Sequence, residues 1–290
     1  MTRGKDKGAG LDRRKAVGFL VAAAVLLSLG GLLIKWVDWN PMAIAGTRSA
    51  IAAIVLLVIL RRPHFTWSFV QIGGALAYAA TVISYVVANR LTTAANTILL
   101  QFTAPLYVAL LGEWFLGEKT TKLDWILIFI VISGMILFFI DSLTAGGLWG
   151  NLCAIASGIC LAWLTLFLRK QKEDSPVESI LLGNIIAALV SLPLMLKSSP
   201  SWSSWVGLIL LGVFQLGLPF ALYSIALKYV KALEAMLISV IEPILNPLWV
   251  FFLMGESPGK WALLGGVIVL ASVTLRGIIT ARGRKIATRL

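Results

Sequence analysis

The chain has 290 residues, of which 59% are hydrophobic and only 13% are charged. An average soluble domain carries about 25% charged residues, so this composition excludes a soluble enzyme or binding domain and indicates a membrane protein. The net charge of +12 does not indicate nucleic-acid binding, because most Lys and Arg residues lie at the two ends of the chain or in short segments between apolar stretches, where they orient a membrane protein.

Ten apolar stretches follow one another along the chain, and each is long enough to cross a bilayer as a helix. They cover residues 16–36, 41–60, 67–89, 94–116, 124–141, 147–168, 176–196, 204–226, 232–254 and 260–280. We therefore predict an all-α integral membrane protein with ten transmembrane helices. The basic residues gather at the two ends of the chain and in alternate connecting segments. By the positive-inside rule, both termini are expected in the cytoplasm.

An internal repeat relates the third and fourth stretches to the eighth and ninth. Both copies keep a proline and a glutamate at the same spacing, Pro105 with Glu118 and Pro243 with Glu256. Each copy contains five stretches, an odd number, so the second enters the membrane from the opposite side. Such inverted repeats are typical of secondary transporters. The predicted organisation is a basic cytoplasmic tail, two inverted five-helix repeats and a second basic cytoplasmic tail, at residues 1–15, 16–142, 143–280 and 281–290.

Three features of the sequence resemble the EamA type of the drug/metabolite transporter superfamily. They are the stretch SLGGLLIKW around Lys35, the stretch PMAIAGTRSAIAAIVLL around Arg48, and the repeated units that end in LGEK and MGES. The resemblance covers residues 16–280 and implies ten spans in two inverted repeats, with export of small metabolites across a bacterial inner (plasma) membrane. Within the superfamily the chain is similar to bacterial aromatic amino-acid exporters, which implies amino acids, aromatic or otherwise neutral, as the solutes.

Three charged residues lie within predicted spans, where a charge costs about 2.5 to 3.5 kcal/mol on insertion scales. Glu113, near the inner end of its span, is interpreted as reaching the membrane interface. Arg48 is either a cation that lines a cavity and binds a solute carboxylate, or an arginine bonded to free carbonyls of a kinked neighbour. Glu242 precedes Pro243 near the middle of its span, and a proline leaves the carbonyl four residues earlier without a partner. Glu242 is therefore either a neutral acid that caps this kink or a group that lines the cavity.

Helical spacing places polar side chains together on one face of several spans. The predicted substrate-binding residues are Tyr78, Gln101, Trp163, Tyr223, Ser239, Glu242, Asn246 and Arg48. Glycines and prolines that let helices bend or approach closely are the predicted hinges, namely Gly30, Gly31, Pro105, Pro219, Pro243 and Pro247. The repeated Gly-Glu pairs at 117–118 and 255–256 are interpreted as a glycine that ends one helix and an acid near the start of the next.

These patterns predict a secondary transporter that works by alternating access around a midplane cavity, with no catalytic residue, metal or cofactor. An enzyme is disfavoured because no catalytic constellation occurs at membrane depth, and the only histidine, His64, is in a predicted loop. A channel is also disfavoured, whereas an exporter of cationic drugs or other metabolites is the alternative. The expected partners are a small-molecule solute, with amino acids as first choice, and the lipid bilayer, without nucleic acid. Proton coupling through Glu242, uniport and the oligomeric state are left open, and a monomer is compatible with the sequence.

Overall fold

The computed structural model describes residues 13–92, 94–140, 147–174, 176–197, 199–245, 249 and 260–287. Helices make up nearly all of these residues, and no strand occurs among them, which confirms the predicted all-α class. The helices are α1 (Arg13–Ser28), α2 (Gly30–Trp36), α3 (Pro41–Leu60), α4 (Phe69–Leu91), α5 (Ala94–Gln101), α6 (Ala104–Leu116), α7 (Lys122–Phe139), α8 (Leu148–Lys170), α9 (Pro176–Met195), α10 (Trp202–Leu210), η2 (Leu211–Gly217), α11 (Leu218–Ala226), α12 (Ala232–Ser239) and α14 (Lys260–Ala287). Residues 241–245 are helical as well.

Six helical segments of the described chain are long and apolar enough to cross a membrane. They are Pro41–Leu60, Phe69–Asn89, Asn96–Leu116, Leu148–Lys170, Pro176–Met195 and Trp202–Ala226. Each coincides with one predicted span to within a few residues. The other four predicted spans also contain helix, but they are interrupted, shorter or only partly described. The number of ten transmembrane helices therefore stays a prediction.

Local signals set several of the helix ends. The side chain of Asn40 accepts hydrogen bonds from the first N–H groups of α3, and Pro41 fits the first turn because it lacks an N–H. Thr121 and Asp124 form a capping box at the start of α7. Gly117 ends α6 in the left-handed conformation with φ of 70°, as the sequence predicts for the first Gly-Glu pair.

Four predicted spans are interrupted near their middles, and one of them is the ninth, in which a turn at Val240 separates α12 from the helix at 241–245. The first divides at Leu29 into α1 and α2, and the fourth divides after Gln101 into α5 and α6. The eighth continues from α10 into the π-helix η2 before Pro219, which cannot donate a hydrogen bond to the carbonyl of Gln215. π-helical turns are often found at functional sites. All four interruptions lie beside the pocket described below.

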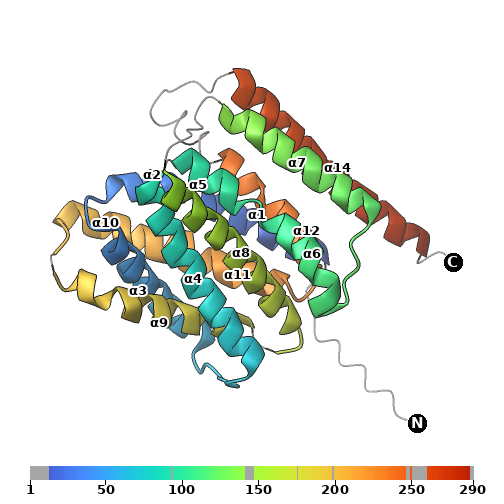
Figure 1. The fold of residues 1–290 in the computed structure, drawn as a ribbon. Coiled ribbons are helices and arrows are strands. Elements are labelled where there is room, and N and C mark those ends of the chain that lie inside the picture. Colours follow the sequence, from blue (N-terminus) through green and yellow to red (C-terminus); the bar gives the residue numbers. More distant parts are fainter. Residues whose placement is uncertain are drawn as a thin grey trace, which may run out of the picture.

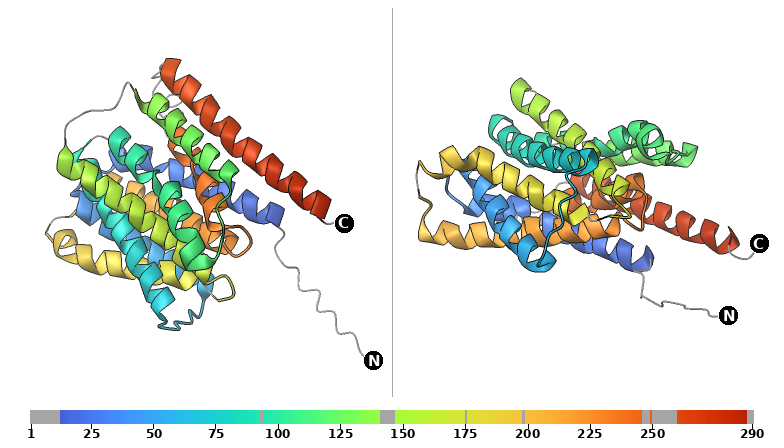
Figure 2. Two further views of the ribbon diagram at one scale, coloured as in Figure 1. Left: turned by 45° about the vertical axis from the view of Figure 1, so that its right-hand side comes forward. Right: turned by 90° about the horizontal axis from the view of Figure 1, so that it is seen from below.

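The helices pack around one large cluster of buried apolar side chains that extends from α1 to α14. Within it α4 packs against α8 and α9, α3 against α9, and α1 against α11. Figure 1 shows α7 and α14 side by side at one edge of the molecule, and the views in Figure 2 show α14 reaching beyond the other helices toward the C-terminus. The centre of the bundle is thus formed by α1, α4, α5, α8, α11 and α12.

The pairing of α7 with α14 depends on glycine. A Cβ atom at Gly265 would lie 2.4 Å from the carbonyl oxygen of Gly134 and 2.5 Å from the backbone nitrogen of Phe138. Small residues let transmembrane helices approach this closely. We expect Gly265→Ala to destabilise the protein by about 1–3 kcal/mol, because backbone atoms must move apart to make room.

Thermal unfolding in detergent measures this effect. Gly18→Ala in α1 is the matched control, since its new Cβ would meet no atom within 4 Å and alanine is the better helix former. Equal midpoints for Gly265→Ala and the native protein would contradict the proposed close packing.

Candidate functional site

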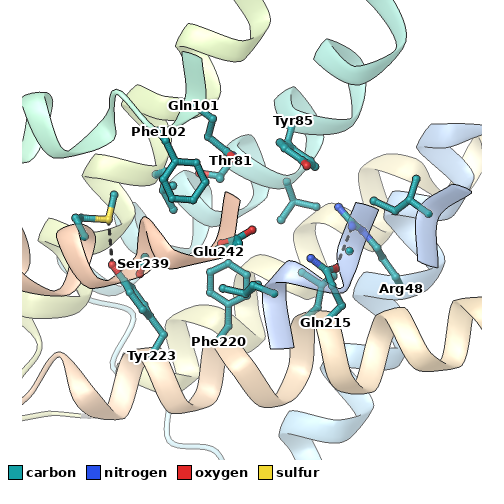
Figure 3. A pocket seen from close by; sticks show the side chains of 17 residues that line it. Arg48, Thr81, Tyr85, Gln101, Phe102, Gln215, Phe220, Tyr223, Ser239 and Glu242 are labelled. Carbon is teal, nitrogen blue, oxygen red and sulfur yellow. Dashed lines mark hydrogen bonds between the residues drawn. The ribbon is translucent and has the colours of Figure 1, made fainter. Parts of the chain in front are cut away.

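A pocket lies at the centre of the bundle, where α1, α2, α3, α4, α5, α8, η2, α11, α12 and the helix after α12 meet. It contains about 800 Å³ of unoccupied space, including its opening to solvent. Its polar lining residues are Arg48, Thr81, Tyr85, Gln101, Gln215, Tyr223, Ser239 and Glu242. Figure 3 shows Arg48 and Gln215 toward one side, Tyr223 toward the other and Glu242 between them.

Arg48 is a buried cation with few partners. Its side chain comes from the middle of α3, and the residue is 2% exposed. Nη1 donates a hydrogen bond to Oε1 of Gln215 at 3.1 Å, whereas Nε has no hydrogen-bond partner in the described structure. A buried guanidinium costs several kcal/mol unless it is paired and hydrogen-bonded. Arg48 therefore keeps donor capacity beside the pocket that a carboxylate could use.

Glu242 is the acidic residue of the pocket. It follows the interruption of the helix at residue 240, and Pro243 leaves the carbonyl of Ser239 without its usual helical donor. No ion pair or hydrogen bond joins the Glu242 side chain to another side chain in the described part of the protein. The pocket thus holds a guanidinium and a carboxyl group that are not paired with each other.

Hydrogen bonds close one side of the pocket across three helices. The hydroxyl oxygens of Thr165 in α8 and Tyr223 in α11 lie 2.8 Å apart, and Tyr223 donates to the sulfur of Met236 in α12 at 3.2 Å. Thr165 also contacts the same sulfur at 3.3 Å. These contacts fix the three helices relative to one another next to Ser239 and Glu242.

A second set of bonds anchors Gln101 at the end of α5. Its amide nitrogen donates to Oγ of Ser157 at 2.8 Å, and Ser157 donates to the carbonyl of Thr81 at 3.1 Å. Gly158 allows this contact, because a Cβ there would lie 2.8 Å from the carbonyl oxygen of Gln101. Gln101 is thus held by α4 and α8, away from Arg48.

The pocket gathers five of the eight predicted substrate-binding residues: Arg48, Gln101, Tyr223, Ser239 and Glu242. Two others do not line it. The hydroxyl of Tyr78 is buried and donates to Asn184 of α9 at 3.1 Å, and Trp163 packs in an aromatic cluster with Trp114, Phe115 and Phe167. Asn246 lies outside the described residues.

The predicted hinges fall near the helix interruptions. Gly30 and Gly31 begin α2 just after the break at Leu29, and Pro105 lies in the first turn of α6 after the break that follows Gln101. Pro219 lies in the first turn of α11 beside η2. Pro243 belongs to the short helix at 241–245, and Pro247 lies outside the described residues.

Sequence reasoning missed the apolar part of the lining. Leu27, Ile34, Phe102, Leu161, Leu216, Phe220 and Met236 contribute to it. The sequence does not distinguish most of them from other apolar residues, since apolar residues occur on every face of these helices. Phe220 is the exception, because it precedes Tyr223 by three residues and therefore shares its helical face.

A charged network lies one turn beyond the Tyr223 side of the pocket, and we call it the Glu118 network. One oxygen of Glu118 accepts from Nε of Arg169 at 2.7 Å, and the other accepts from the backbone N–H of Ala232 at 3.0 Å. Arg169 also donates to the carbonyls of Leu227 and Lys228 at 2.8 and 2.9 Å. The acid of the Gly-Glu pair therefore caps α12, far along the chain, rather than the next helix, α7, which Thr121 caps.

The described residues contain no group of three His, Cys, Asp or Glu side chains placed to hold a metal ion. What the pocket offers instead is a guanidinium with unused donor capacity, one carboxyl group and several aromatic and apolar surfaces. This combination suits reversible binding of a small solute that carries both polar and apolar parts.

Comparisons with known proteins agree with a membrane transporter. The model of the EamA-like transporter family matches the chain twice, over residues 14–140 and 148–277. An uncharacterized transporter of Archaeoglobus fulgidus is 28% identical over 261 residues, which cover 88% of this chain and 94% of that protein. The uncharacterized transporter YdfC of Bacillus subtilis is 24% identical over 280 residues, or 90% of this chain and 91% of YdfC.

Two further similarities extend this result. The uncharacterized inner membrane transporter YedA of Escherichia coli is 26% identical over 254 residues, which cover 81% of each chain. A protein crystal structure matches with a TM-score of 0.78 over 93% of this chain and 99% of the other, at 18% sequence identity. At that identity the structural similarity establishes the fold alone.

Proposed function

This chain belongs to the EamA-like transporter family and is a membrane transporter, and we propose that it exports small metabolites by alternating access around the central pocket. Amino acids, aromatic or otherwise neutral, are the proposed solutes. The proposed direction and solute class follow the resemblance to amino-acid exporters, and the residues of the pocket support the class independently.

One observation carries the proposal: Arg48 and Glu242 line the same pocket without pairing to each other. An amino acid at neutral pH carries a carboxylate and an ammonium group. Its carboxylate would satisfy the free donors of Arg48, and its ammonium would neutralise Glu242. Tyr85, Phe102 and Phe220 line the same space and offer aromatic surface to an apolar side chain.

Alternating access by two inverted five-helix repeats belongs to the same proposal. It is supported by the two matches of the family model and by α5 and α12, which start and end at equivalent positions of the sequence repeat. The helix pairs support it as well, because exchanging the two repeats converts the pairing of α4 with α8 into the pairing of α11 with α1. A pseudo-twofold axis of this kind places the solute site near the midplane.

The proposed location is a bacterial inner membrane with both termini in the cytoplasm. The distribution of basic residues supports this orientation, and the E. coli relative is named an inner membrane transporter. In this orientation the Glu118 network lies at the cytoplasmic end of the pocket.

Export of cationic drugs is the second candidate, and the surroundings of Glu242 favour it. A carboxyl group beside Tyr85 and Phe220 is an arrangement that binds organic cations. A cation alone, however, would leave the donors of Arg48 unsatisfied. We therefore rank amino acids first.

Counterflow in proteoliposomes tests the proposal, with labelled neutral amino acids and cationic dyes as solutes. We expect exchange of at least one amino acid, and we expect Glu242→Gln to weaken it about tenfold by removing the partner of the ammonium group. Glu113→Gln is the control, because the Glu113 side chain is 61% exposed at the end of α6. Exchange of dyes with no exchange of any amino acid would reject the amino-acid class in favour of the second candidate. Repeating the counterflow with a pH gradient shows whether protons move with the solute.

A further inference from the structure

Gln215 is the only side chain that bonds Arg48 in the described structure, and its backbone is unusual. It belongs to the π-helix η2, in which the N–H of Leu218 bonds to the carbonyl of Val213, five residues earlier. Pro219 follows, so the carbonyl of Gln215 has no N–H four residues later to accept from. The widened turn places the Gln215 side chain beside Arg48 in the pocket.

The first predicted span, which is interrupted at Leu29, leaves room for this side chain. Gly30 begins α2, and a Cβ atom there would lie 3.0 Å from Nε2 and 3.2 Å from Cδ of Gln215. Gly212 of η2 also packs closely on α3, since its Cβ would lie 2.9 Å from the carbonyl oxygen of Arg48. Gln215 is therefore in contact with both the cation and the start of α2.

The amide oxygen of Gln215 occupies a position on Arg48 that suits a carboxylate oxygen. Arginine donates through a planar fork that matches carboxylates in two parallel hydrogen bonds, whereas an amide offers one neutral oxygen. A charged acceptor binds guanidinium more strongly than a neutral one. A solute carboxylate that reaches Arg48 thus competes favourably with Gln215.

We propose that Gln215 is a displaceable substitute for the solute carboxylate, a positioning residue that holds Arg48 while the pocket is empty and releases it when a carboxylate binds. This assignment rests on the proposed function and adds a mechanism to it. Because Gln215 lies on η2 and against Gly30, its displacement acts on the interrupted first and eighth spans together. Binding of a carboxylate at Arg48 is thereby coupled to η2 and to the start of α2, where the helices are interrupted and best able to bend.

Gln215→Glu tests the assignment, because it converts the neutral substitute into a permanent anion. The glutamate pairs with Arg48 and excludes a second carboxylate. The probes are L-phenylalanine and 2-phenylethylamine, which differ only by the carboxylate, and binding is measured by calorimetry on the purified protein. We expect phenylalanine to bind about tenfold to a hundredfold more weakly, with phenylethylamine unchanged or tighter.

Gln101→Glu is the matched control, since it places the same charge in the same pocket on a side chain that bonds Ser157 instead of Arg48. Because this glutamate does not pair with Arg48, we expect it to weaken phenylalanine binding much less than Gln215→Glu does. Gln215→Leu gives a second test, because removing the competitor should strengthen phenylalanine binding while lowering the thermal stability of the empty protein. A structural role for Gln215 would instead change the affinity for both probes alike.

The outcomes separate this assignment from the proposed function. If the native protein prefers phenylalanine and Gln215→Glu keeps that preference, the role of Gln215 is wrong while amino-acid binding stands. If the native protein binds neither probe, or binds both equally well, the proposed pairing of Arg48 with a solute carboxylate is wrong, and the role of Gln215 fails with it.

Discussion

Arg48→Met is expected to make the empty protein more stable and to weaken exchange of carboxylate-bearing solutes strongly. The guanidinium is buried, its Nε has no hydrogen-bond partner in the described structure, and its one partner is a neutral amide. Replacing buried ionic groups by apolar side chains of similar volume often stabilises proteins by about 1–4 kcal/mol. The proposed role of Arg48 in solute binding would account for this cost, and loss of a charge-assisted contact weakens solute binding about tenfold to a hundredfold.

Thermal unfolding in detergent without solute, together with counterflow, measures both effects. Thr47→Val is the matched control, because Thr47 is a buried neighbour on α3 whose hydroxyl also has no partner in the described structure and which does not line the pocket. It should stabilise slightly and leave exchange intact. If Arg48→Met unfolds at a lower temperature and leaves the preference for carboxylates unchanged, Arg48 has a structural role instead.

Arg169→Leu is expected to be the most destabilising single change at the Glu118 network. The side chains of Arg169 and Glu118 are 14% and 17% exposed, so removal of one leaves the other as a largely buried, unpaired charge. Breaking a buried pair in this way costs about 3–5 kcal/mol, and partial exposure places this pair toward the lower end. The carbonyls of Leu227 and Lys228 also lose their donor.

Two readouts check this prediction. Thermal unfolding gives the loss of stability, and hydrogen exchange reports whether the first turn of α12, which Glu118 caps at Ala232, opens. Lys119→Leu is the control, because it breaks an exposed pair with Glu113 at 4.0 Å that contributes about 0–1 kcal/mol. Glu118→Gln should fall between the two, since an amide still accepts from Ala232. Equal effects of Arg169→Leu and Lys119→Leu would show that the Glu118 network does not hold α12 in place.

The sequence predicts those helices whose ends are set by residues next to them in the chain. The apolar run at 41–60 and α3 share their limits, because Asn40 and Pro41 define the start and Arg61 follows the end. The breaks at Leu29 and within η2 could not be predicted from the sequence. No proline lies at Leu29, and no amino-acid composition is characteristic of a π-helical turn. Glycine pairs and Pro219 indicated where bending is allowed, but the form of each bend depends on the helices packed against it.

The same limit applies to the pocket. Arg48 and Glu242 could be identified because a charge deep in an apolar span is costly wherever it faces. Tyr78 and Tyr85 lie on one helical face at a spacing of seven residues, yet Tyr85 lines the pocket while Tyr78 bonds Asn184 of α9. Trp163 likewise turns toward Phe115 and Phe167. Which side of a helix meets the pocket is decided by partners distant in sequence, and spacing alone carries no information about them.

The most direct test of the account is whether Arg48 and Glu242 hold opposite ends of one solute. Affinities of the native protein, Arg48→Met and Glu242→Gln are measured for L-phenylalanine, 2-phenylethylamine and 3-phenylpropionate, which remove in turn the carboxylate and the ammonium group. The account predicts that Arg48→Met binds phenylalanine and phenylethylamine equally, and that Glu242→Gln no longer distinguishes phenylalanine from phenylpropionate. Variants that weaken all three ligands by the same factor would contradict it.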